Sequence, residues 1–204
     1  MPDERAGNGR TGRKEGGRVG EVIESSTTGL VAEACELHGA PAFGSFVRVQ
    51  AEHPIVGVVF DACTHSIEPN RRPVAYGRTE EELRREQPQI FALLRTEFHA
   101  LVIGYLEEGR PVPLLPPRPA RIHSFVYLCD EEEVRAFTRT DEYLRRILNS
   151  SGLPSDELVV AVLRQAVRAH GGERGYLVRA GKDLSRLLGD DYDRLSSIVR
   201  RIAL

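Results

Sequence analysis

Four short segments rich in β-forming residues follow one another between residues 18 and 63, and they constrain the fold more than any other feature. Their sequences are RVGEVIES, GLVAEACEL, GSFVRVQAE and PIVGVVFDAC. Turn-forming residues separate them, at 25–29, 38–44 and 53–54. Residues 47–52 alternate apolar and polar side chains, as in a strand with one face in water, whereas 55–60 is apolar on both faces. Strands at this spacing favour a barrel or a sandwich over a parallel βαβ sheet.

Helical signals follow the fourth segment and a polar loop. Thr79 and a glutamate three residues later form a capping box, which marks a helix start. Pro88 interrupts the pattern, because the residue before a proline disfavours helical backbone. We therefore predict two short helices, at about 80–87 and 88–96. Strand character returns over 98–107, and we expect this strand to close the barrel by pairing with the earlier ones.

Five prolines lie within residues 111–119, which predicts an extended, semi-rigid linker. One further strand could follow at 122–128, and the remaining sequence is mostly helical. Its longest helix is expected over 156–170, with Pro154 near its start and Gly171 just past its end.

These patterns predict an α+β fold, in which a small closed β-barrel with inserted short helices precedes a mostly α-helical C-terminal region. We assign four regions to the chain: a disordered tail at 1–17, the barrel at 18–110, a Pro-rich linker at 111–121 and a mostly helical C-terminal domain at 122–204. The tail is predicted from its five glycines and mixed charges, which cannot bury enough surface to offset the entropy of ordering.

The charge balance limits the classes of partner that the chain is expected to bind. Lys and Arg number 28 against 30 Asp and Glu, so the chain is not a generally basic nucleic-acid coat and only a local basic patch remains open. The longest apolar run, residues 100–106, is far shorter than the roughly 18 residues that a membrane span needs. The cysteine count of three is odd, which favours reduced thiols. We therefore expect a cytoplasmic protein with no membrane segment.

No motif in the chain predicts catalysis. The segment GNGRTGRK at residues 7–14 weakly resembles a P-loop, but Arg13 follows its last glycine where a P-loop has lysine, and no strand precedes it. The chain also lacks a G-x-S-x-G nucleophile elbow and an H-E-x-x-H zinc motif. We therefore predict that the protein is not an enzyme and needs no cofactor.

Two cysteine–histidine pairs supply ligand types that zinc uses, namely Cys35 with His38 and Cys63 with His65. Both pairs fall at predicted strand ends and could meet. Zinc sites more often show two-cysteine knuckles, however, and a free cysteine also behaves as a small buried hydrophobe. We expect no metal site and keep these four residues as the alternative.

Several adjacent arginines form local basic pairs, at 71–72, 84–85, 145–146 and 200–201. Arg71 and Arg72 lie in a predicted loop and have the best claim to contact a phosphate or a partner. The other pairs are expected to be solvated helix faces. Nucleic-acid binding through Arg71 and Arg72 is the alternative function, although the absence of tryptophan and the few aromatic residues disfavour a base-stacking platform.

Three segments, at 18–30, 40–49 and 54–62, resemble the HAS barrel, the small β-barrel at the N-terminus of HerA-type hexameric DNA translocases. The most distinctive part is an SSTT turn, formed by Ser25, Ser26, Thr27 and Thr28. The second and third segments match the family pattern in residue type at Gly44, Phe46, Val47, Val49, Gly57 and Val58. The resemblance covers about residues 18–120 and implies the same barrel here.

In the translocases an ATPase domain follows the barrel, and its ATP-binding residues have no counterpart in residues 121–204. The chain thus looks like a stand-alone bacterial barrel protein. Because the translocase barrel helps ring assembly and docks a nuclease, the resemblance implies a non-catalytic interaction or assembly module in DNA processing. Its expected partner is a HerA-type ATPase or an associated nuclease, with self-association as a variant. The expected contact residues are Ser25, Ser26, Thr27, Thr28, Arg71 and Arg72.

Overall fold

The computed structural model describes residues 17–68, 70 and 72–202. The predicted tail at 1–17 lies outside the described residues except for Gly17. Within the described part, seven strands are present: β1 (Arg18–Ser25), β2 (Gly29–Ala34), β3 (Phe46–Val49), β4 (Ile55–Ser66), β5 (Leu94–Glu107), β6 (Arg110–Val112) and β7 (Phe125–Leu128). The helices there are α1 (Glu80–Glu86), the 3₁₀ helix η1 (Pro88–Leu93), α2 (Glu131–Phe137), α3 (Glu142–Leu148), α4 (Ser155–Ala169), α5 (Arg174–Leu188) and α6 (Tyr192–Ile202). The expected combination of an antiparallel sheet with later helices is confirmed.

All strand pairs are antiparallel, and their order is β2-β1-β7-β3-β4-β5-β6. β2 also pairs with β5, so the hydrogen-bonded pairs run in a ring through β1, β2, β5, β4, β3 and β7. Register shifts in β4, at Val56/Gly57 and Val59/Asp61, mark irregularities of the β-bulge kind, which bend and twist a strand. The side chains inside this ring form one buried cluster that includes Val22, Val59, Phe98 and Val126.

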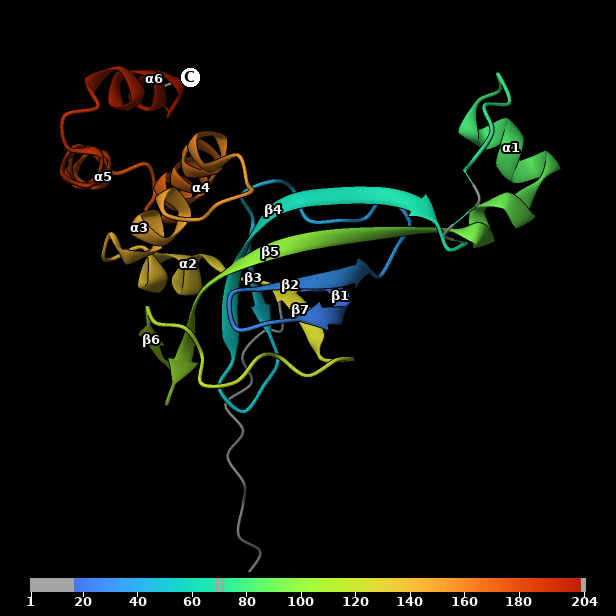
Figure 1. Ribbon diagram of the computed structural model, residues 1–204, viewed down its shortest axis with the longest axis horizontal. Coiled ribbons are helices and arrows are strands. Elements are labelled where there is room, and N and C mark those ends of the chain that lie inside the picture. The colour runs from blue at the N-terminus through green and yellow to red at the C-terminus, as the bar shows by residue number, and fades with distance from the viewer. Residues whose placement is uncertain (1–16, 69, 71, 203–204) are drawn as a thin grey trace, which may run out of the picture.

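β7 completes the ring from beyond the proline-rich segment. It lies between β1 and β3 and pairs with both. The strand at 125–128, which we expected within the C-terminal region after the linker, therefore belongs to the same sheet as β1. Residues 113–121, which follow β6, form the connection that returns the chain to the ring (Figure 1).

β4 and β5 continue past the other strands as a two-stranded ribbon that carries α1 and η1 at its far end (Figure 1). We call the described residues between 64 and 96 the arm. The capping box at Thr79 is present, and α1 ends before Pro88 as predicted. The second predicted helix is a 3₁₀ helix that ends at Leu93, since the next residues pair with β4 instead. α1 buries none of its residues.

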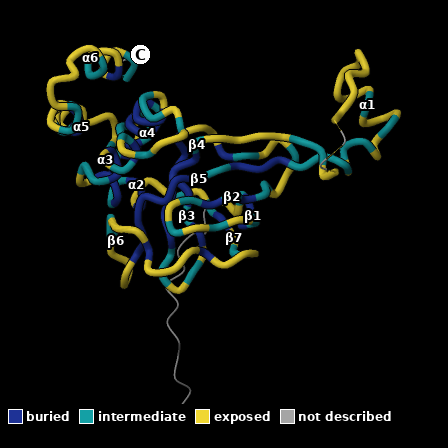
Figure 2. Tube along the Cα trace, viewed as in Figure 1, coloured by how far each residue is buried: buried dark blue, intermediate teal, exposed yellow. Residues whose placement is uncertain are grey.

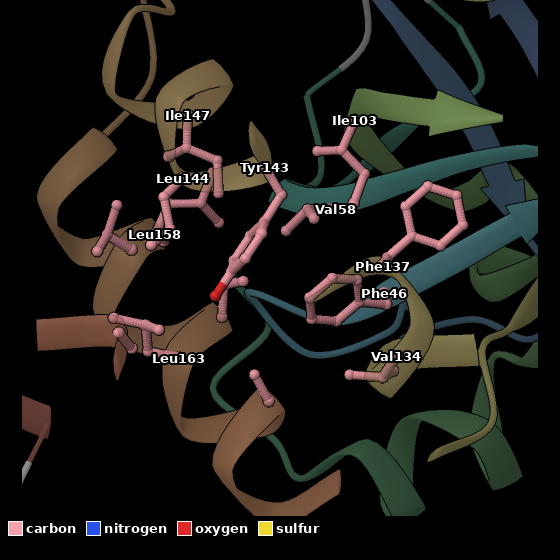
Figure 3. Close-up of a cluster of buried hydrophobic side chains, with 14 of the residues drawn as sticks. Phe46, Val58, Ile103, Val134, Phe137, Tyr143, Leu144, Ile147, Leu158 and Leu163 are labelled. Atoms are coloured by element: carbon pink, nitrogen blue, oxygen red, sulfur yellow. The ribbon is translucent and has the colours of Figure 1, made fainter. Parts of the chain in front are cut away.

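The later helices pack against the outer face of the ring. Neighbouring residues such as Val58 and Val59 belong to different clusters, because successive strand side chains point to opposite faces. The outer cluster joins strands to helices (Figure 3), and its labelled members are Phe46, Val58, Ile103, Val134, Phe137, Tyr143, Leu144, Ile147, Leu158 and Leu163. Burying each large apolar side chain contributes about 1.5–3 kcal/mol. Figure 2 shows buried residues concentrated where β4 and β5 meet these helices, and exposed residues over the end of the arm.

Of the described helices, none combines the length and the apolar character needed to cross a bilayer. The longest are α4 and α5, and both are amphipathic, with one apolar face turned into the core. α4 begins after Pro154 and ends before Gly171, in agreement with the predicted caps.

Candidate functional site

The SSTT turn joins β1 to β2 and is held by its own side chains. The Ser26 hydroxyl accepts hydrogen bonds from the backbone N–H groups of Thr28 (3.3 Å) and Gly29 (3.0 Å). The backbone N–H of Val102 donates to the Thr28 carbonyl over 3.0 Å, which ties the turn to β5. Ser26 is therefore a structural residue of the turn. Thr28 is exposed, and the Ser25 hydroxyl oxygen is buried without a hydrogen-bond partner among the described residues.

A cleft of about 630 Å³ opens beside this turn, and we call it the α3 cleft. One wall is formed by the turn and the sheet and the other by α3 and the segment after it. Its lining residues are Thr28, Gly29, Phe60, Leu101, Pro113, Glu142, Arg145, Arg146, Asn149, Ser150, Ser151 and Leu153. The fold thus brings the predicted turn together with hydroxyl, amide and guanidinium groups from a distant part of the sequence.

The two arginines of the cleft differ in their partners. Arg145 is exposed and lies 3.5 Å from a Glu142 carboxylate oxygen and 3.9 Å from one of Asp141. Arg146 is half-buried, and its guanidinium has no ion pair or hydrogen bond to any residue that the structure describes. A guanidinium in this state can bind a carboxylate or a phosphate through two parallel hydrogen bonds. The sequence pattern predicted a solvated helix face for this arginine pair. The opposite wall of the cleft comes from the SSTT turn and the sheet, and the sequence around the pair does not indicate that they lie nearby.

The other predicted contact residues lie elsewhere. Arg72 is exposed in the loop of the arm, and Arg71 lies outside the described residues. Since the turn lines the α3 cleft while Arg72 belongs to the arm, the structure does not bring the two predicted groups together.

The four residues of the alternative zinc site do not come together either. His38 Nδ1 lies 3.3 Å from the Thr64 hydroxyl, whereas Cys63 Sγ lies 3.7 Å from His65 Nδ1. Thr64 is the neighbour of Cys63 on β4, so their side chains point to opposite faces of the ribbon. Cys35 is exposed and joins no group of metal-ligating side chains in the described part of the chain.

The structure instead places Glu97 with the second pair. The ligand atoms of Cys63, His65 and Glu97 all lie within 4.8 Å of one another. Glu97 is on β5, directly opposite Cys63 in the register. Sequence reasoning missed it because the pairing of β4 with β5 over these residues cannot be read from either strand alone.

Cys63 and Cys129 are not set up as nucleophiles. Partial desolvation by its neighbours raises the pKa of the exposed Cys63 thiol, and the charges of Glu97 and Asp61 raise it further against the opposing effect of Arg95. Burial raises the pKa of Cys129 well above its usual range. Both side chains are therefore mainly neutral thiols near pH 7, whereas nucleophilic cysteines need a lowered pKa.

The strand arrangement and the SSTT turn agree with a comparison against known families, in which the model of the HAS barrel domain matches residues 19–108. Over these residues the chain is similar to the HAS barrel domain family. The resemblance expected from the sequence is thereby confirmed. No curated protein matches the chain. The matched part of the HAS barrel domain contains β2 to β5 and nearly all of β1, and it ends before β6 and β7.

Proposed function

We propose that this protein is a non-catalytic interaction module of the kind found at the N-terminus of HerA-type translocases. In this proposal the ring of strands is a closed, rigid barrel that presents the SSTT turn and the α3 cleft to a partner protein. The partner is a P-loop ATPase of the HerA type or a nuclease that works with it in DNA processing. The match to the HAS barrel domain supports the proposal, and the raised pKa values of Cys63 and Cys129 disfavour a nucleophilic cysteine at either position.

The observation that carries the proposal is the unpaired guanidinium of Arg146 in an open cleft. Asn149, Ser150 and Ser151 provide neutral hydrogen-bonding groups around it. Phe60 adds apolar surface to the same cleft. Such a mixture suits a segment of a partner protein that carries a carboxylate beside apolar side chains, because a charged group in a cleft gains most when it meets a complementary charge.

The test is affinity capture from a native lysate with the full chain, followed by identification of the captured proteins. We expect the wild type to retain a P-loop ATPase or a nuclease, and Arg146→Ala to lose it with an affinity reduced by about tenfold or more, as for a hydrogen-bonded charge at an interface. Arg200→Ala is the matched control, since Arg200 is an exposed arginine in the last turn of α6, outside the cleft. Light scattering of the purified chain tests the variant in which copies of the chain associate with each other.

Three results would contradict the proposal. The first is a strictly monomeric chain that retrieves neither class of protein. The second is equal retention of the partner by the Arg146 and Arg200 variants, which would remove the cleft from the interface. The third is ATP hydrolysis by the purified chain alone.

Nucleic-acid binding through loop arginines is the second candidate, and the exposure of Arg72 on the arm supports it. The same arm also carries the acidic first turn of α1, so its charge is mixed. If this candidate is correct, binding to a duplex or single strand weakens steeply with added salt and is lost when Arg71 and Arg72 are both replaced by alanine. Absence of binding at low salt would exclude it.

A further inference from the structure

The outer face of the strand ring carries a row of acidic side chains where the arm begins. Glu21 of β1 is the cross-strand neighbour of Glu33 of β2. Glu33 in turn lies opposite Glu97 of β5, and Glu97 lies opposite Cys63 of β4. Like charges directly opposite one another destabilise a sheet. Glu21 is paired with His123 (Nδ1 to Oε1, 2.6 Å), but Glu33 has no ion pair with any described residue.

Three side chains with metal-ligating atoms converge at the end of this row. Cys63 and His65 are two residues apart on β4, so they share a face, and Glu97 lies across from Cys63. Cys63 Sγ is 3.7 Å from His65 Nδ1, and His65 Nε2 is 3.5 Å from Glu97 Oε1. The ligand atoms of a tetrahedral zinc ion lie roughly 3.4–3.6 Å apart. Cys63 Sγ faces Nδ1 and Glu97 Oε1 faces Nε2 of the same imidazole, so the His65 ring must turn to offer one nitrogen to an ion between the three side chains, whose ligand atoms already lie within 4.8 Å of one another.

We propose that Cys63, His65 and Glu97 bind a zinc ion where the arm leaves the ring, with the fourth position open to solvent. One thiolate, one imidazole and one carboxylate are ligands that zinc takes in proteins. Cys63 is exposed, which gives the ion a path from solvent, and Glu97 is buried, which fixes one ligand to the sheet. The Cys63 thiol loses its proton to solvent when the sulfur bonds to zinc.

Arg95 supplies the positive charge in the structure as it stands. Its Nε lies 2.8 Å from Glu97 Oε1 and 3.1 Å from His65 Nε2. The guanidinium thus contacts two of the three ligands and competes with the ion for them. The Arg95 side chain is 35% exposed, so it can turn into solvent when zinc binds. Removal of this side chain should therefore tighten binding.

Zinc at this place would link β4 to β5 beside Glu97, the residue of β5 nearest the arm that still pairs with β2. Beyond Glu97, β5 no longer pairs with β2, and the arm continues as two strands. The ion would fix the direction in which the arm leaves the ring. This inference differs from the sequence prediction of no metal, and it keeps Cys63 and His65 from the alternative set while Glu97 replaces Cys35 and His38.

The test is titration of the reduced, metal-free full chain with Co²⁺, which reports a thiolate ligand through ligand-to-metal charge-transfer absorption and a tetrahedral site through its visible bands. We expect both signals in the wild type and in Cys35→Ser, the matched control that removes an exposed thiol outside the site. Cys63→Ser should lose the charge-transfer absorption, and Glu97→Gln should weaken Co²⁺ binding about tenfold or more. Added Zn²⁺ should displace Co²⁺ and remove the spectrum.

Arg95→Ala provides a second readout that does not depend on loss of a ligand. We expect it to bind Co²⁺ several-fold more tightly than the wild type, while circular dichroism shows that all variants remain folded. The inference is overturned if the folded wild type gives no thiolate absorption, if that absorption survives in Cys63→Ser, or if Arg95→Ala leaves the affinity unchanged. None of these measurements involves a protein partner, so the metal site and the interaction function fail or stand separately.

Discussion

Gly44 sets how closely the strand ring approaches α4. Its φ of +82° is in the left-handed region, and a Cβ built there would lie 2.5 Å from the Cβ of Ala161. We predict that Gly44→Ala lowers the free energy of unfolding by about 2–4 kcal/mol, the sum of backbone strain and overpacking. Gly77→Ala is the control, because its φ is +64° but nothing lies within 4 Å. It should cost only about 1–2 kcal/mol of strain. Urea unfolding measures both, and equal losses would disprove the packing role of Gly44.

His170 couples stability to pH. Its Nε2 lies 2.9 Å from the Thr138 hydroxyl and its ring stacks on Tyr176 at 4.1 Å. Burial, and then the charge of Arg179, lowers the pKa of His170 in the folded protein. The folded state therefore binds the proton less readily than the unfolded state, whose pKa is about 6.5. The contribution of His170 to the free energy of unfolding is therefore fully present above that value. It decreases as the pH falls from there to the lower pKa of the folded state.

We predict that the free energy of unfolding, measured in urea at a series of pH values from about 5 to 8, falls more toward acid in the wild type than in His170→Gln. The substitution keeps a polar side chain but removes the titrating group. Identical pH profiles for the two proteins would show that His170 does not contribute to this dependence.

The far end of the arm, residues 68–92, buries none of its described residues. α1 buries none of its residues, and its ion pair between Arg84 and Glu80 is half exposed, which makes it worth little. We predict that replacing residues 68–92 by Asn-Gly, a two-residue hairpin turn, leaves the free energy of unfolding within about 1 kcal/mol of the wild type. Urea unfolding with far-UV circular dichroism measures this. A loss of several kcal/mol would mean that the arm packs on the ring.

The sequence predicted most of the elements but few of their partners. The α4 caps and the Thr79 capping box were readable because such signals lie within a few residues of each other. β5 begins at Leu94, within the second helix expected from the sequence, because Leu94 pairs with Ser66 of β4. Such a pairing depends on register, which is set across the sheet and leaves little trace in either strand.

The dependence on contacts between elements also explains which residues of the candidate sites could be predicted from the sequence. The SSTT turn was singled out by its motif, and Cys63 with His65 by their spacing. Arg146 was assigned to a solvated face, and Glu97 was not singled out at all. The role proposed for each depends on another element, since Arg146 lines a cleft together with Thr28 and Glu97 lies opposite Cys63. Sequence spacing alone indicates contacts within an element, whereas these sites form between elements.

At the scale of the whole molecule, the sheet and the helices share one core. Ile103 of β5 and Leu163 of α4 are in the same buried cluster, and both are almost fully buried. We predict that Leu163→Ala lowers the free energy of unfolding by about 2–5 kcal/mol. We also expect the ring and the helices to unfold in one transition, so amides of β1 and α4 should lose protection from hydrogen exchange together. Earlier exchange throughout the helices, with the ring still protected, would contradict this.

The position of β7 between β1 and β3 has a consequence for synthesis. A nascent chain that has emerged only to residue 120 has two strands, the first and the third, whose edges both lack their common neighbour. Exposed strand edges readily pair with other chains. The polypeptide must therefore keep these edges apart from other molecules until Leu128 leaves the ribosome, and any fragment cut at the proline-rich segment would inherit the same hazard permanently.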